Sequence, residues 1–205
     1  MGRKNSSNES APIFFLKLVG SVEEAPKFVQ MVKEGDSYVQ GDSFDTLSGE
    51  VVEFSIKTYE YTEGKKKVEG RKWVLRMVDL DEQLVVDFSM SSLSMGILNS
   101  LLSADSLSGN LEIKVYRNKE GFDNAYVTLN GERLNWKLSY DEQKKMIKEI
   151  PFGGKVMKDK TELNEYLINE AKNYLPNIIA AQEKKQAVAA NDSFDNEGEG
   201  DDLPF

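Results

Sequence analysis

The side chains able to do chemistry in this 205-residue sequence are charged and aromatic ones, because histidine and cysteine are both absent. Without histidine, the chain lacks the usual general base near neutral pH and the commonest metal ligand. Without cysteine, it has no thiolate nucleophile, no disulfide and no cysteine-based metal site. These absences favour a binding protein over an enzyme, and we expect no cofactor and no bound metal.

Two patterns that resemble enzyme motifs do not have the required arrangement. The segment GKKKVEG, residues 64–70, lacks the Gly-Lys-Ser/Thr ending of a phosphate-binding loop. Four acids could in principle hold two metal ions, but three of them fall at an expected turn between strands, where acids are ordinary. These acids are Asp79, Asp81, Glu82 and Asp87. Neither pattern supports a catalytic role.

Basic and aromatic side chains concentrate between residues 57 and 76, in a chain whose net charge is −9. Residues 21–53 are acidic, and residues 186–205 contain six acids and no base. A negative net charge disfavours nucleic acid as a partner, but the distribution of charge matters more than its sum. The sequence therefore predicts one basic region within an acidic protein.

The alternation of apolar and polar residues predicts the elements that position these side chains. A helical apolar stripe, with Ser91 or Ser92 as its cap, predicts a helix over 93–105. Strands are expected at 13–19, 50–61, 71–80, 84–91, 107–117 and 125–134. A hairpin loop is expected at 62–70 and a second loop at 118–124, while residues 28–32 fit a strand or a helical turn equally well.

After the last of these strands, the pattern changes to that of helices. Residues 139–150 fit a helix, and 151–160 read as a basic loop. A further helix, capped by Thr161, follows with an apolar stripe, and Pro176 is expected to break or restart it.

Three strands, a helix and two more strands follow one another in the order of the OB-fold, a five-stranded Greek-key barrel. Another α+β sheet with the same element order is the alternative. The predicted fold is therefore mainly β with helices. Its parts are a disordered leader (1–11), an N-terminal strand extension packing on the barrel (12–45), an OB-fold core (46–136), a helical C-terminal extension (137–185) and a disordered acidic tail (186–205).

Strand parity places a set of basic and aromatic residues away from the predicted core. In an OB-fold, two loops and the strand face between them hold the oligonucleotide. Cations there contact phosphates, and aromatic rings stack on exposed bases. The candidate residues for single-stranded DNA are Lys57, Tyr59, Tyr61, Lys65, Lys66, Lys67, Arg71, Lys72, Trp73, Arg76, Lys114, Tyr116, Arg117, Lys119 and Phe122.

A structural interpretation of the same residues remains open. Outward tyrosines opposite lysines are common cross-strand pairs on any solvated sheet. A lysine-rich hairpin tip also protects a sheet edge. Trp73 shares its parity with Leu75 and Met77, which is the pattern of a core residue.

The last residues of the sequence form a second candidate site, in the segment DDLPF. A polar acidic segment stays extended, and an exposed terminal aromatic is unfavourable unless a partner buries it. This segment is similar to the acidic tip of bacterial single-stranded DNA-binding proteins, where aspartates precede Ile-Pro-Phe. The matching residues are Asp201, Asp202, Pro204 and Phe205, with Leu203 where isoleucine is usual.

The chain as a whole more closely resembles the single-stranded DNA-binding proteins of bacteriophages, which combine an OB-fold core with an acidic tail ending in an aromatic residue. Some of those proteins hold zinc, a version that the lack of cysteine and histidine rules out. The resemblance implies sequence-independent binding of single-stranded DNA in replication, recombination and repair. It also implies that the tail lies over the cationic groove of its own protein when DNA is absent.

The resemblance further implies that the tail docks on a polymerase, helicase, primase or nuclease, with Phe205 in a hydrophobic pocket and Asp201 and Asp202 against a basic rim. Two alternatives remain: a β-barrel adaptor whose partner is a protein, and an RNA-binding or strand-annealing protein. Neither a signal peptide nor a membrane segment is apparent, which predicts a cytoplasmic protein, in the bacterial host if the chain is phage-encoded. Homo-oligomerisation is left open.

Overall fold

The chain folds mainly into β-strands in a computed structural model that describes residues 11–21, 23–64 and 66–195. The strands, in chain order, are β1 (Ile13–Val19), β2 (Lys27–Glu34), β3 (Ser37–Phe44), β4 (Thr46–Glu63), β5 (Lys66–Asp79), β6 (Glu82–Ser89), β7 (Asn110–Arg117), β8 (Asp123–Leu129), β9 (Glu132–Arg133), β10 (Lys148–Phe152) and β11 (Lys155–Asp159). The helices are α1 (Ser92–Leu101), α2 (Tyr140–Lys145) and α3 (Thr161–Asp195).

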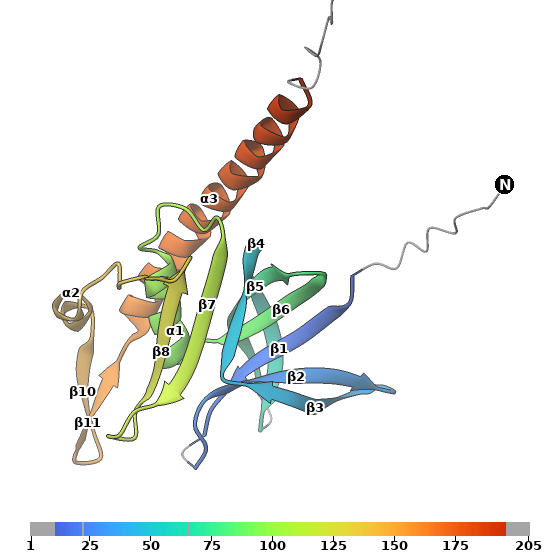
Figure 1. The fold of residues 1–205 in the computed structure, drawn as a ribbon. Coiled ribbons are helices and arrows are strands. Elements are labelled where there is room, and N and C mark those ends of the chain that lie inside the picture. Colours follow the sequence, from blue (N-terminus) through green and yellow to red (C-terminus); the bar gives the residue numbers. More distant parts are fainter. Residues whose placement is uncertain (1–10, 22, 65, 196–205) are drawn as a thin grey trace, which may run out of the picture.

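Nine strands form one large sheet, in the order β3-β2-β1-β6-β5-β4-β7-β8-β9 (Figure 1). The predicted succession of three strands, a helix and two strands is confirmed by β4, β5, β6, α1, β7 and β8. The sheet is not a closed barrel, because the free edge of β6 pairs in parallel with β1 rather than with β8. The strand β8, which would close the barrel by pairing with β6, contacts the helix α1.

The core lies where the period-two pattern placed it. Trp73, Leu75 and Met77 are fully buried on one face of β5, and the stripe of α1 is buried through Ile97 and Leu98. Burial of large apolar side chains is the dominant favourable term in folding, so these alternating residues select the strand register.

The start of α1 is set by Ser91, one of the two caps that the sequence offered. The Ser91 hydroxyl accepts a hydrogen bond from the Ser94 backbone N–H at 3.2 Å, and the Ser94 hydroxyl accepts one from the Ser91 N–H at 3.1 Å. This reciprocal arrangement is a capping box.

The strands β4 and β5 form a longer ribbon than expected, and the predicted loop at 62–70 is wrong. The strand β4 continues to Glu63 and β5 begins at Lys66, so the turn is only two residues long. Gly64 makes this turn possible, because its φ of 62° lies in the left-handed region that favours glycine. Cross-strand pairs such as Tyr61 with Val68 carry the ribbon to its tip.

The N-terminal region joins the main sheet as strands. Residues 28–32, which fitted a strand or a helical turn, lie in β2. The strand β3, which the sequence did not predict, pairs with β2 and is exposed along its whole length. The predicted leader lies outside the described residues except for Ala11.

The C-terminal region contains a β-hairpin in addition to helices. The expected helix at 139–150 is shortened to α2, and the expected loop at 151–160 is the β10–β11 hairpin. The helix α3 begins at Thr161, whose N–H and hydroxyl donate to the Asp159 carboxylate at 2.9 and 2.6 Å. Asp159 therefore accepts from the first backbone N–H of the helix.

The helix α3 also continues through Pro176, contrary to the predicted break. Proline removes one backbone hydrogen bond, but Ala171, Leu175 and Ile179 on either side of it are buried. Packing of that stripe on the rest of the protein holds the two halves in line. The helix extends to Asp195, so the predicted start of a disordered tail at residue 186 is also wrong, and the remainder of that tail lies outside the described residues.

Candidate nucleic-acid interface

The outward face of the β4–β5 ribbon carries the aromatic residues that the sequence singled out. Tyr59 and Tyr61 are 42 % and 44 % exposed, and their ring centroids lie 5.9 Å apart. Gly70 stands opposite Tyr59, and a Cβ there would lie 2.6 Å from Tyr59 Cζ. The ring of Tyr59 therefore rests on the bare backbone of β5, and the two tyrosines form a small exposed aromatic surface.

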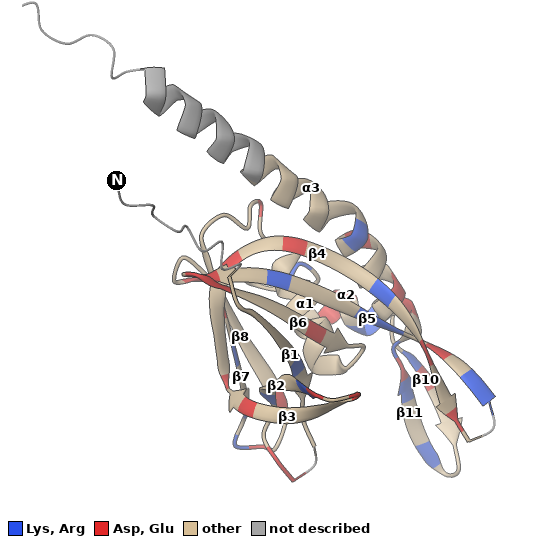
Figure 2. Cartoon of the chain, turned by 90° about the vertical axis from the view of Figure 1, so that its right-hand side faces the viewer, with Lys and Arg blue, Asp and Glu red and all other residues tan. Residues whose placement is uncertain are grey.

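Most bases of the ribbon are neutralised by a neighbouring acid. Lys72 forms an ion pair with Asp87 on β6. Arg76 Nη1 lies 3.1 Å from Glu53 Oε2, and Lys67 Nζ lies 3.3 Å from Glu60 Oε2. Both strands carry basic and acidic positions in Figure 2. The ribbon, which the sequence predicted to be one basic region, is thus a surface of mixed charge.

Lys57 differs from these bases. It lies directly opposite Lys72 in the ladder, on the same face as Tyr59 and Tyr61. Within the described part of the chain, no carboxylate forms an ion pair with Lys57. Two like charges directly opposite each other on a sheet repel. Because Lys72 is already paired with Asp87, that repulsion is small, and Lys57 is the cation of this face that can bind a phosphate without giving up a carboxylate.

Arg71 lies on the opposite face of the ribbon and holds it to α3. Its guanidinium donates two hydrogen bonds to the Glu165 carboxylate, one of them 3.1 Å long. The hydrogen bond from Arg71 lowers the pKa of Glu165 below its ordinary value of 4.5, and the pKa of Arg71 is raised by the same contact. Arg71 is therefore a structural contact rather than a free cation.

We expect Glu165→Gln to lower the free energy of unfolding at neutral pH by no more than about 1 kcal/mol, because both partners are about two-fifths exposed. The folded-state pKa of Glu165 is depressed, so its stabilisation is present above pH 4.5 and is lost as the pH falls through the lower folded value. Thermal unfolding across pH 3–7 checks this expectation. Glu170→Gln, on an exposed part of the same helix, is the control, and a wild-type difference that persists at the lowest pH would contradict the pairing.

Trp73 leaves the candidate set, because its side chain is 0 % exposed. Its ring stacks on Phe88 at a centroid distance of 3.7 Å and an interplanar angle of 5°. A base could reach the ring only if the core opened. The core parity of Trp73, which the sequence already showed, decides its role.

The strand β7 and the loop that follows it (residues 118–122) carry the remaining candidates. Lys114, Tyr116 and Phe122 are exposed, with Phe122 at 64 %. Arg117 pairs with Asp123 at 2.8 Å and donates to the Ser21 carbonyl, which joins this loop to the loop after β1. This loop and the tip of the β4–β5 ribbon lie well apart in both views (Figures 1 and 2).

One concave site escaped the sequence analysis. A pocket of about 570 Å³ lies between α1, β8, α2, the β10–β11 hairpin and α3. Its lining includes Trp136, Tyr140, Lys144, Lys158 and Lys160. Tyr140 and Lys144 are four residues apart, the spacing of one side of α2, but Trp136 lies before that helix, so no local pattern groups it with them.

Among the described residues, no three acids lie close enough to hold a metal ion, and no helix is long and apolar enough to cross a membrane. Comparisons of the chain with protein-family models, curated proteins and solved structures found no match.

Proposed function

We propose that this protein binds single-stranded DNA without sequence preference, and that residues 46–136 form an open OB-type unit. The pairing of β4 with both β5 and β7, and of β5 with β6, supports this topology. In this proposal β1 occupies the edge of β6 at which an OB barrel would close.

The observation that carries the proposal is the exposed pair Tyr59 and Tyr61 next to Lys57. Single-stranded nucleic acid presents base faces and phosphates, and aromatic rings beside a cation match both. Each stacked base contributes about 1–3 kcal/mol, and stacking tolerates any base. Lys57, on the same strand, has no ion-pair partner among the described residues and supplies the phosphate contact.

The ion pairs of the ribbon predict a modest dependence of affinity on salt. When a phosphate replaces the carboxylate partner of an ion-paired lysine or arginine, few additional ions are released. We expect about two to four phosphate contacts, and hence a slope of log K against log salt of about −1.5 to −3 for a single strand.

We further propose that the acidic segment 186–205 recruits replication, recombination or repair proteins through Asp201, Asp202, Leu203, Pro204 and Phe205. The support is the similarity of DDLPF to the tip of bacterial single-stranded DNA-binding proteins. A tethered tip gains affinity from a high local concentration, and its acids fit a basic rim on the partner.

The deciding experiment is titration of fluorescein-labelled oligo-dT with the full chain over a salt series, with duplex DNA and RNA as competitors. We expect binding that prefers the single DNA strand and weakens with the slope given above. A chain ending at Asp195 is titrated alongside, and it should bind more tightly because four acids are removed. Absence of binding by both chains would rule out the DNA-binding proposal. Preference for RNA would favour the RNA-binding alternative.

A protein-interaction adaptor is the second candidate, and the β10–β11 hairpin favours it. Ile150, Phe152, Val156 and Met157 are between 47 % and 70 % exposed on this two-stranded projection. Exposed apolar side chains gathered in one place are typical of protein docking surfaces. This function predicts that neither chain binds oligo-dT in the same titration.

A further inference from the structure

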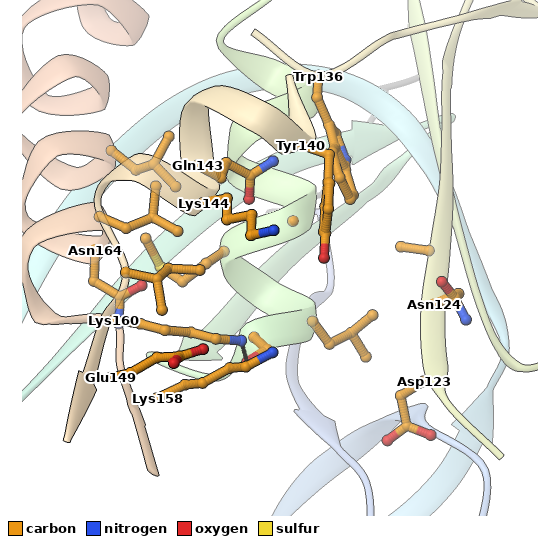
Figure 3. A pocket seen from close by; sticks show the side chains of 18 residues that line it. Asp123, Asn124, Trp136, Tyr140, Gln143, Lys144, Glu149, Lys158, Lys160 and Asn164 are labelled. Carbon is orange, nitrogen blue, oxygen red and sulfur yellow. Dashed lines mark hydrogen bonds between the residues drawn. The ribbon is translucent and has the colours of Figure 1, made fainter. Parts of the chain in front are cut away.

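The pocket at the C-terminal side of the sheet joins five elements that are far apart in the sequence (Figure 3). Its walls come from α1, from the start of β8, from the segment that includes α2, from the β10–β11 hairpin and from the first two turns of α3. Every described element after β9 thus contributes to it. The C-terminal region therefore builds a site that the sheet alone does not have.

The two ends of the pocket have different chemistry. Trp136 and Tyr140 lie at one end in Figure 3. They are 50 % and 67 % exposed, so two large aromatic rings are open to solvent there. Lys158 and Lys160 lie at the other end, with Lys144 between the two groups. An aromatic surface and a cationic surface therefore face one cavity.

The walls between the ends combine apolar and amide groups. Leu163 and Leu167 of α3 form a buried apolar part. Asn124, Gln143 and Asn164 add side-chain amides, each of which can both donate and accept a hydrogen bond. This mixture is typical of pockets for small polar aromatic ligands.

The charge balance of the pocket favours an anion. Lys160 Nζ donates to the Ser92 hydroxyl at 2.8 Å, and neither Lys144 nor Lys158 forms an ion pair among the described residues. Two acids also line the pocket, but Asp123 is already paired with Arg117 at 2.8 Å. The pocket is therefore lined by three lysines and by one acid, Glu149, for which the described residues show no ion pair.

We propose that this pocket holds one nucleotide of a bound single strand, with its base on Trp136 and Tyr140 and its phosphate between Lys144, Lys158 and Lys160. A nucleotide joins a flat aromatic group to an anion over a short distance, which matches the two ends of the pocket. Base stacking on aromatic rings and phosphate contacts with lysine are the two general terms of single-strand binding. The inference rests on the proposed function and adds a second contact point to the β4–β5 ribbon.

The first turn of α3 connects the two contact points. Asn164 lines the pocket, and the next residue, Glu165, holds Arg71 on β5. The pocket and the ribbon are therefore held together at this turn, although Arg71 lies on the ribbon face opposite Tyr59 and Tyr61. The pocket would then anchor one nucleotide while the ribbon contacts others.

The tryptophans of the chain provide a direct test. There are two, and Trp73 is 0 % exposed, so Trp136 alone reports contact with a ligand in solution. We expect oligo-dT to quench the tryptophan emission of the full chain and the quenching to disappear in Trp136→Phe. Thymidine monophosphate should give the same quenching at higher concentration, including in the Tyr59→Ala/Tyr61→Ala variant.

Affinity for oligo-dT supplies the second readout. Trp136→Ala should weaken binding at least about fivefold, which corresponds to the lower end of one base stack. Lys158→Ala should weaken it about as much. Lys155→Ala, on the same hairpin but outside the pocket lining, is the matched control and should bind as the wild type does.

Three results would overturn the inference. If oligo-dT binds without quenching Trp136, and Trp136→Ala and Lys158→Ala bind normally, the pocket is not used while the proposed function stands. If an acidic peptide ending in phenylalanine quenches Trp136 and oligo-dT does not, the pocket binds a peptide. If oligo-dT binds to no variant and thymidine monophosphate causes no quenching, the pocket and the proposed function fail together.

Discussion

Replacing Tyr59 and Tyr61 together by alanine should weaken oligo-dT binding by about 30-fold or more. The estimate takes two stacked bases at about 1–3 kcal/mol each. Both rings are exposed and lie 5.9 Å apart, so they can stack on neighbouring bases without rearrangement of the core. Fluorescence anisotropy with labelled oligo-dT at fixed salt measures the loss.

The same double variant should remain folded. Its rings contact each other and the backbone at Gly70, a surface contact whose loss costs about 0.2–1 kcal/mol. Tyr38→Ala is the control, since Tyr38 is 59 % exposed on β3, far along the sheet from the ribbon. Unchanged affinity in the double variant would mean that the two tyrosines are only a cross-strand pair, as the structural interpretation of the sequence allowed.

Replacing Trp73 by alanine should cost about 3–5 kcal/mol of the free energy of unfolding, because it removes a fully buried aromatic side chain. The loss includes the stack on Phe88 and the contact with Phe54, whose ring centroid lies 6.0 Å away. A domain has only about 5–15 kcal/mol in total, so this change removes a large share of the stability. Urea unfolding followed by circular dichroism measures it.

A smaller change at Trp73 separates packing from hydrogen bonding. The indole Nε1 is buried with no hydrogen-bond partner among the described residues. Trp73→Phe removes this unsatisfied donor while keeping a ring against Phe88, so it should cost much less than Trp73→Ala. Phe122→Ala, at an exposed loop residue, should change stability by less than about 0.5 kcal/mol. A loss below about 1 kcal/mol for Trp73→Ala would contradict the core position.

These two experiments address the two faces of the ribbon, and they separate stability from binding. Trp73 and Tyr59 are fourteen residues apart in the chain, yet they lie on adjacent strands of one ladder. Side chains alternate across a strand, so one face packs the core while the other is free for a ligand. A variant of the exposed face that unfolded the protein would show that the assigned faces are reversed.

Several features followed from the sequence by itself, because they depend on local patterns. Alternation placed Leu75 inside and Lys57 outside, and the stripe of α1 followed from its helical spacing. A serine cap at Ser91 or Ser92 followed from hydroxyls that can accept from free backbone N–H groups, and the structure selects Ser91. The order of strands and helices from β4 to β8 was correct for the same reason.

Other features were decided only when distant segments met. The continuous α3 depends on burial of its stripe, which outweighs the hydrogen bond lost at Pro176. The sheet stays open because β1 pairs in parallel with the edge of β6. No local pattern specifies which strand pairs with a given edge. The ion partners of Arg71 and Lys72, at Glu165 and Asp87, likewise come from other elements.

The sequence by itself therefore determined which residues face the core, which are exposed, and the charge and aromatic content of the chain. Those properties depend on side-chain chemistry and on the periods of strands and helices. Only the tertiary structure decided which exposed bases are neutralised, that the two predicted loops lie apart, and that Trp136 shares a pocket with Lys158. These depend on contacts between residues far apart in the chain, where packing and charge pairing select one arrangement among many with the same local pattern.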